Sequence, residues 1–181
     1  MMEIKIWGRG GQGAITTGQI IAIAAFYDGK QCQTFPSFGV EREGAPLQAF
    51  VRISDEKINL RSQVYNPDVV MILEPSLIDS VDTVKGLKKK GSVIVNTNKK
   101  KRELGIKGDF QVHTVDATKI ALQIFAKPIV NTPIIGAFAK VTNIVTIKSL
   151  NKAVDEVFER KGKKITELNK KAILEVYNST K

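Results

Sequence analysis

The sequence predicts an α/β fold with an open, mostly parallel sheet and helices on both faces, in three Rossmann-like layers. Short apolar runs of strand length alternate along the chain with longer segments of helical pattern. Two of the short runs, residues 69–73 and 92–96, are almost continuously apolar, as in parallel strands that are covered on both faces. A glycine-rich turn joins the first apolar run to the first helical segment. We expect one domain over residues 1–181, because this length suits a single core.

The expected elements follow from hydrophobic periodicity and from turn residues. Strands are expected at residues 4–7, 30–35, 47–54, 58–60, 69–73, 92–96 and 110–115. Helices are expected at residues 14–27, 77–85, 119–126, 134–142, 149–160 and 165–177. Ser76 is expected to cap the second helix, and Gly136 permits close packing of the fourth helix against another element. The last two helices are amphipathic, and we expect them to pack on the domain.

The glycine-rich turn is Gly8-Arg9-Gly10-Gly11-Gln12-Gly13. It satisfies G-x-G-x-x-G between a strand and a helix, where main-chain N–H groups can approach a phosphate or a carboxylate. A NAD-type site also needs an acid at the end of the second strand; residues 31–35 contain none, and Asp28 comes too early. Two interpretations stay open: an anion site, or glycines that only allow the helix to pack tightly on its strand.

Residues 35–46 form the most unusual stretch, Phe-Pro-Ser-Phe-Gly-Val-Glu-Arg-Glu-Gly-Ala-Pro. Its prolines and glycines forbid regular structure, yet aromatic and charged residues lie between them. A loop with this chemistry is typical of a functional segment. Because it follows a strand, we expect it at the same carboxyl edge of the sheet as the glycine turn.

The net charge of +10 raises the question of a nucleic-acid partner. The excess lysines lie in segment ends and loops, with no aromatic residues between them to stack on bases. Solvated lysine clusters are the favoured interpretation, and a surface that attracts an acidic protein or a polyphosphate is the alternative. We expect no nucleic-acid partner.

The scarcity of cysteine and histidine limits the chemistry of the chain. Cys32 is the single cysteine, so an internal disulfide, a zinc site or an iron–sulfur site cannot be built from thiols of this chain. Cys32 is expected to be a buried, inert thiol, and His113 a surface or edge residue rather than a catalytic base. The apolar runs are too short to span a bilayer, and the first residues lack the pattern of a signal peptide. These features favour a cytoplasmic protein with no membrane partner.

Three motifs together resemble those of one protein family. They are the turn at residues 8–14, the loop at residues 35–46 and Asn131-Thr132-Pro133-Ile134-Ile135-Gly136-Ala137. In this combination the chain closely resembles the gamma subunits of the pyruvate:ferredoxin oxidoreductase family, from Met1 to about Tyr177. The combination is far more specific than the glycine turn alone.

The resemblance implies one part of a larger enzyme. Members of this family decarboxylate a 2-oxoacid on thiamine diphosphate with Mg²⁺, pass electrons through [4Fe-4S] clusters to ferredoxin, and transfer the acyl group to coenzyme A. The resemblance therefore implies alpha, beta and delta subunits as partners that hold these cofactors, ferredoxin as the electron acceptor, and coenzyme A as a substrate of a shared site. Pyruvate is the first expectation for the 2-oxoacid. A branched-chain 2-oxoacid such as 2-oxoisovalerate is the alternative, and a stand-alone nucleotide-binding protein is an alternative of another class.

The resemblance places no catalytic residue and no metal ligand on this chain. In the second loop Glu43 stands where the family pattern commonly has arginine, so Arg42 is the stronger candidate for an anion or interface contact. The residues expected to contact coenzyme A or a neighbouring subunit are Gly8, Arg9, Gly10, Gly11, Gln12, Gly13, Phe38, Gly39, Glu41, Arg42, Asn131 and Thr132. Which of the two loops contacts coenzyme A stays open.

Overall fold

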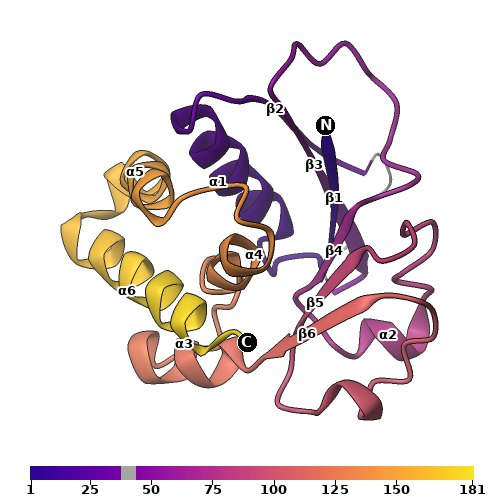
Figure 1. The fold of residues 1–181 in the computed structure, drawn as a ribbon. Helices are drawn as coiled ribbons and strands as arrows, with labels where there is room; N and C mark the ends of the chain where they lie inside the picture. Colours follow the sequence, from indigo (N-terminus) through magenta and orange to yellow (C-terminus); the bar gives the residue numbers. More distant parts are fainter. Residues whose placement is uncertain (38–43) are drawn as a thin grey trace.

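The computed structural model describes residues 1–37 and 44–181, and within them six strands form one sheet in the order β2-β3-β1-β4-β5-β6 (Figure 1). The strands are β1 (Met2–Arg9), β2 (Gln31–Pro36), β3 (Pro46–Ser54), β4 (Val69–Ile72), β5 (Ser92–Asn96) and β6 (Gln111–Val115). β1, β4, β5 and β6 pair in parallel, whereas β3 runs antiparallel to both β1 and β2. Five strands therefore share one direction, and the expected open, mostly parallel sheet is confirmed.

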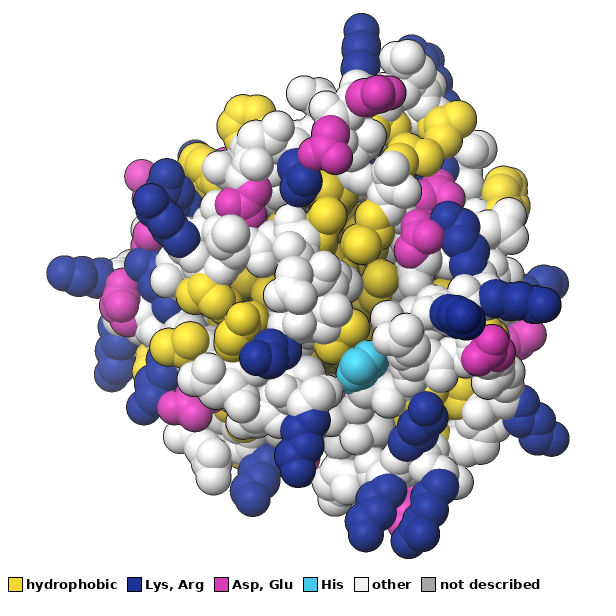
Figure 2. Space-filling model, viewed as in Figure 1, with side chains coloured by type: hydrophobic (Ala, Val, Ile, Leu, Met, Phe, Trp, Pro, Cys, Tyr) yellow, Lys and Arg dark blue, Asp and Glu magenta, His cyan; other side chains and the backbone are white. Residues whose placement is uncertain are grey.

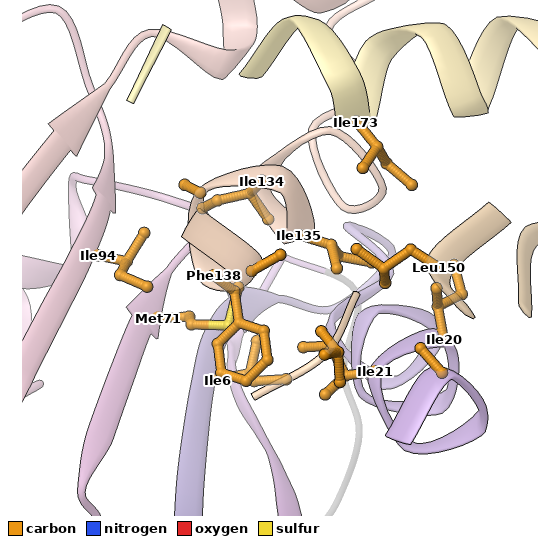
Figure 3. Packing of buried hydrophobic residues seen from close by; sticks show 14 of the residues in the cluster. Ile6, Ile20, Ile21, Met71, Ile94, Ile134, Ile135, Phe138, Leu150 and Ile173 are labelled. Carbon is orange, nitrogen blue, oxygen red and sulfur yellow. The ribbon is translucent and has the colours of Figure 1, made fainter. Parts of the chain in front are cut away.

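Two helices lie directly on one face of the sheet and three more pack outside them. α1 (Ala14–Tyr27) contacts β1, β2 and β3, and α4 (Ile134–Thr142) contacts β5 and β6. α5 (Ile147–Phe158) packs on α1, while α6 (Lys163–Ser179) packs on α4 and α3 (Ala117–Phe125); the short 3₁₀ turn η2 (Glu159–Lys161) joins α5 to α6. Figure 3 shows Ile6 and Met71 of the sheet beside Phe138 of α4, with Ile21 of α1 close by.

Helix α4 approaches α6 closely at Gly136. A Cβ at Gly136 would lie 2.7 Å from the main-chain N of Tyr177, and nearer still to the carbonyl oxygen of Ile173. Only a glycine lets the two backbones come this close. The close packing expected at Gly136 is therefore confirmed.

The second face of the sheet carries a smaller cluster built on Trp7, Val70, Ile72, Val93 and Val95. It is covered by the short helix α2 (Leu77–Ser80), the 3₁₀ turn η1 (Lys101–Glu103) and the segments around them. Trp7 Nε1 donates to the carbonyl of Thr83 over 2.8 Å, which ties the segment after α2 to the sheet. Lys5 Nζ donates to the carbonyl of Lys85 over 3.2 Å, and burial lowers the pKa of Lys5.

Some expected elements are wrong in extent. The helix expected at residues 77–85 ends at Ser80, because Val81 is extended (φ −143°, ψ 154°) and the following carbonyls serve Trp7 and Lys5 of β1. Ser76 does not cap that helix with its side chain. Residues 58–60 are not a strand.

Cys32 is half-buried rather than buried, and this partial burial raises the pKa of its thiol. His113 lies on the edge strand β6, as expected.

None of the helices in the described residues is long and apolar enough to cross a membrane.

Candidate functional site

The glycine turn lies at the carboxyl edge of the sheet, between β1 and α1. Gly11 and Gly13 have positive φ angles of 90° and 78°, and Gly13 is the N-cap residue of α1. A glycine provides no side chain to cap a helix, and the first N–H groups of any helix have no acceptor within it. The positive end of the α1 dipole therefore lies at the glycine turn.

Asn131 lies against this turn, although more than a hundred residues separate Asn131 from the turn in sequence. Thr17 Oγ1 donates to the carbonyl of Asn131, at a distance of 2.8 Å. A Cβ at Gly13 would lie 2.7 Å from Asn131 Nδ2, so the turn and Asn131 are in direct contact. The sequence expectation that residues 8–13 and 131–132 belong to one site is consistent with this packing.

Thr132, next to Asn131 in the chain, is fully buried and lies just before α4. Its Oγ1 has no hydrogen-bond partner among the described residues. Buried hydroxyls are nearly always paired, because an unpaired one costs stability. Thr132 is therefore an unusual polar group at this position.

The side chains of Arg9 and Gln12 connect the turn to the neighbouring strand. Gln12 Oε1 accepts from the N–H of Arg9 over 2.8 Å, and Gln12 Nε2 donates to Glu74 Oε2 over 2.9 Å. Arg9 donates through Nη1 to the carbonyl of Gly44 over 3.0 Å and through Nη2 to Ser76 Oγ over 3.1 Å. The Gly10 N–H donates to the carbonyl of Ala45 over 2.9 Å. The end of the loop at residues 35–46 is thus hydrogen-bonded to the glycine turn.

Glu74 is an acid of this edge, two residues beyond the end of β4. Burial alone would raise the pKa of Glu74, but hydrogen bonds from Gln12 and Ser76 and the charge of Arg9 outweigh it, so the pKa lies below its ordinary value. Glu74 is consequently a carboxylate at neutral pH. Its negative charge offsets part of the positive charge that Arg9 brings.

Beyond Glu74 the carboxyl edge opens into a hollow of about 660 Å³ above β5 and β6. Asn96 fixes one wall: its Nδ2 donates to the carbonyl of Leu73 over 3.0 Å, and its Oδ1 accepts from the Thr118 N–H over 3.1 Å. Asp116 Oδ1 accepts from the Lys119 N–H over 2.8 Å and so caps α3. The hollow is lined by polar groups from the ends of three adjacent strands.

The described residues bring together only part of the expected site. Gly8, Arg9, Gly10, Gly11, Gln12, Gly13, Asn131 and Thr132 gather at one edge. Phe38, Gly39, Glu41 and Arg42 lie outside the described residues. Sequence reasoning did not select Glu74, Asn96 or Asp116, although each stands at the end of a strand, the position where ligands of open α/β sheets bind.

Asp28, which comes too early in the sequence for a ribose contact, has a structural role. Its carboxylate accepts from the Thr146 N–H over 2.8 Å, from Thr146 Oγ1 over 2.9 Å and from Ser149 Oγ over 2.6 Å. These residues begin α5, so Asp28 ties α1 to the first turn of α5. It lies at the end of α1 opposite to the glycine turn.

Comparison with known proteins identifies close relatives. The model of the pyruvate ferredoxin/flavodoxin oxidoreductase family matches residues 3–179. The chain is 54% identical to the pyruvate synthase subunit PorC of Methanocaldococcus jannaschii over 178 residues, which covers 98% of this chain and 96% of the relative. It is 50% identical to the pyruvate/ketoisovalerate oxidoreductases common subunit gamma of Thermococcus litoralis, covering 99% of this chain and 97% of the relative.

Solved structures show the same fold. The crystal structure of the pyruvate oxidoreductase subunit PORC of Thermotoga maritima superposes with a TM-score of 0.87 at 39% identity, covering 99% of this chain and 97% of that one. A chain of the 2-oxoglutarate:ferredoxin oxidoreductase of Magnetococcus marinus, solved with 2-oxoglutarate, coenzyme A and succinyl-CoA bound, has a TM-score of 0.80. At 20% identity, covering 98% of this chain and 30% of that one, it supports the fold alone.

Proposed function

Because the chain belongs to the pyruvate ferredoxin/flavodoxin oxidoreductase family, we propose that it is the gamma subunit of a multi-subunit pyruvate:ferredoxin oxidoreductase. The complex would convert pyruvate, coenzyme A and oxidised ferredoxin to acetyl-CoA, CO₂ and reduced ferredoxin. The proposal includes alpha, beta and delta subunits as partners and a cytoplasmic location. Its main support is similarity over nearly the whole length of relatives that are named as subunits of pyruvate synthase.

In this proposal the redox cofactors belong to the partner chains. A [4Fe-4S] cluster takes four thiolates, and this chain has one cysteine. Among residues 1–37 and 44–181, no three histidine, cysteine or acidic side chains gather in a group that could hold a metal ion. The proposal therefore assigns thiamine diphosphate, Mg²⁺ and the clusters to the partner chains and gives this chain no step of the electron transfer.

The role proposed for this chain is to bind and orient coenzyme A at the carboxyl edge of its sheet. The observation that carries this role is the convergence of the α1 N-terminus, Arg9 and the end of the second loop at one place. Unpaired N–H groups at a helix N-terminus favour an anion, and coenzyme A carries several phosphate charges. Arg42, on the same loop, would add a further positive charge, and Phe38 a flat apolar contact.

The subunit assignment is tested by mass spectrometry of the complex that co-purifies, without oxygen, through a tag on this chain. We expect partner chains with thiamine diphosphate and iron–sulfur clusters in amounts equal to this chain. Recovery of this chain alone would contradict the assignment.

The coenzyme A role is tested by the kinetics of the purified complex. Arg42→Ala should raise the KM for coenzyme A and leave the KM for pyruvate unchanged, because only one substrate loses a charge partner. Arg160→Ala, an exposed arginine of η2, is the matched control and should change neither constant. An unchanged KM for coenzyme A in an intact Arg42→Ala complex would remove Arg42 from this role.

One observation favours a second substrate. The relative from Thermococcus litoralis is named as a common subunit of pyruvate and ketoisovalerate oxidoreductases. This chain would then serve two complexes, of which the second acts on the branched-chain acid 2-oxoisovalerate. The tagged purification distinguishes the possibilities, because a shared subunit brings down two different sets of partner chains.

A further inference from the structure

The segment between β5 and β6 concentrates positive charge. Residues 99–107 contain five cationic side chains and one acidic side chain, Glu103. The cations are Lys99, Lys100, Lys101, Arg102 and Lys107. Within the described part of the chain, none of the five forms an ion pair with a carboxylate. Figure 2 shows Lys and Arg side chains along the lower edge of the molecule, where Figure 1 places the segment between these two strands.

The backbone that carries these cations is anchored to the core. Leu104, 6% exposed, packs in the cluster on the second face of the sheet, and Ile106 and Phe110 pack against that cluster. Glu103 Oε2 accepts from the Lys100 N–H over 2.7 Å, so a backbone group engages the single carboxylate of the segment. The cations are thus held on a fixed turn.

A hollow of about 610 Å³ lies among these side chains. Its lining consists of Lys100, Lys101, Arg102, Gly105, Ile106 and Lys107, which we call the cationic cup. Four of the six residues are cationic and none is acidic. Half-buried Ile106 is the one large apolar residue of the lining.

The chemistry of the cup selects among anionic ligands. The three-residue helix η1 is too short to offer a phosphate the converging main-chain N–H groups of a longer helix N-terminus. No aromatic ring lines the cup on which a base could stack. Long cationic side chains around an aliphatic residue suit carboxylates spaced along a polypeptide, with an aliphatic side chain between them.

We propose that the cationic cup is a docking surface for an acidic segment of a partner protein, with an aliphatic residue of that segment seated on Ile106. The inference does not rest on the coenzyme A role, because the cup lies on the β5–β6 segment and includes no residue of the glycine turn.

The test measures binding of a fluorescein-labelled, glutamate-rich peptide with one central leucine to the full chain, by fluorescence anisotropy at physiological salt. The cup variant is the triple substitution Lys101→Glu, Arg102→Glu and Lys107→Glu. The matched control reverses three exposed lysines of α6, with Lys163→Glu, Lys164→Glu and Lys171→Glu. Both variants have the same net charge, and all six side chains are exposed, so both should fold; thermal unfolding checks this.

We expect the cup variant to raise the Kd about tenfold or more, since three exposed ion pairs are lost and each is worth about two- to threefold. The control should change the Kd less than about twofold, because charges farther away than the Debye length of about 8 Å are screened. Equal weakening in both variants would overturn the proposal, since binding would then follow net charge alone. Tighter binding of tripolyphosphate or single-stranded DNA than of the peptide, lost in the cup variant, would also overturn it.

A second measurement locates the bound peptide directly. A carbodiimide joins carboxylates of the peptide to lysine amines that touch them, and mass spectrometry identifies the lysines. The proposal expects cross-links at Lys100, Lys101 or Lys107 of the unmodified sequence. Cross-links spread evenly over the lysines of α6 would contradict it.

Discussion

Gln12 Nε2 donates a hydrogen bond to Glu74 Oε2 over 2.9 Å, and this contact joins the glycine turn to the segment just beyond the end of β4. The same glutamine accepts a hydrogen bond from the Arg9 N–H through its side-chain oxygen, Oε1. The side-chain amide of Gln12 therefore holds two residues of the turn together and attaches the turn to the segment after the adjacent parallel strand. The geometry of the carboxyl edge depends on this pair.

Replacement of Gln12 should raise the pKa of Glu74. Burial favours the neutral form of Glu74, and the hydrogen bond from Gln12 is the leading interaction that opposes it. In a Gln12→Leu variant the carboxyl should titrate at higher pH, as followed by ¹³C NMR. Asp28 provides an internal control, because its partners are Thr146 and Ser149 and its titration should not move. An unchanged Glu74 titration would mean that the contact is not formed in solution.

Acid should destabilise the protein partly through Asp28. Burial raises the pKa of Asp28, but hydrogen bonds from Ser149 and Thr146 and the charge of Lys30 outweigh it, so the folded pKa lies below the unfolded value of 3.8. A carboxyl with a lowered folded pKa stabilises the fold above its unfolded pKa and loses this contribution as pH falls through its folded pKa. Stability should therefore decline below about pH 4.

The variant Asp28→Asn isolates this contribution in urea unfolding. At pH 7 it should lower the free energy of unfolding by about 1 to 2 kcal/mol, because charged hydrogen bonds to the first turn of α5 are lost. The difference from the unmodified protein should shrink towards pH 3. Asp109→Asn, at an exposed aspartate, is the control and should have little effect at either pH. A difference that is the same at both pH values would contradict the assigned role of the charge.

The two glycines of the turn with positive φ allow a matched comparison. Gly11→Ala and Gly13→Ala both place a side chain in a left-handed conformation, at a cost of about 1 to 2 kcal/mol. A Cβ at Gly11 meets nothing within 4 Å, whereas one at Gly13 would press on Asn131. Gly13→Ala should therefore lower stability more than Gly11→Ala in thermal unfolding. Equal losses would show that Asn131 moves away at no cost and that the turn is not fixed by it.

Thr132→Val should stabilise the isolated chain. The substitution keeps the shape of the side chain and removes a buried hydroxyl that has no partner among the described residues. An unpaired buried hydroxyl costs about 1 to 3 kcal/mol. If the hydroxyl serves the coenzyme A site, the same variant should raise the KM for coenzyme A in the assembled complex. A rise in stability with unchanged kinetics would leave Thr132 without a functional role, and a fall in stability would mean that the hydroxyl has a partner.

The sequence predicted the order of most elements because their signals are local. Residues 14–27 and 134–142 were expected as helices with the observed bounds, since a glycine turn opens one and a polar segment with a proline precedes the other. The direction of β3 has no such local signal. It depends on the pairing of β3 with β2, across residues 37–45, and with β1, which ends at Arg9.

The second face of the sheet shows where local reasoning failed. Residues 77–85 have a helical pattern, but Trp7 Nε1, far earlier in the chain, donates to the carbonyl of Thr83. A buried indole N–H needs an acceptor, and this requirement favours the turn over further helix. The candidate site was predicted in part for a similar reason. Its two motif segments are visible in sequence, but the contact of Gln12 with Glu74 exists only once β1 and β4 are neighbours.

Gly136→Ala tests the close approach of α4 and α6, which covers the core of the sheet. By helix propensity alone the change should stabilise α4 by about 1 kcal/mol, because alanine is the better helix former. The added Cβ, however, would overlap the carbonyl oxygen of Ile173 and lie 2.7 Å from the Tyr177 nitrogen. Backbone atoms cannot turn aside as a side chain can, so the helices must separate, and overpacking of this kind costs about 1 to 3 kcal/mol or more. We expect a net loss of stability in urea unfolding. A net gain would mean that α6 shifts on α4 without disturbing the residues of α4 that face the sheet.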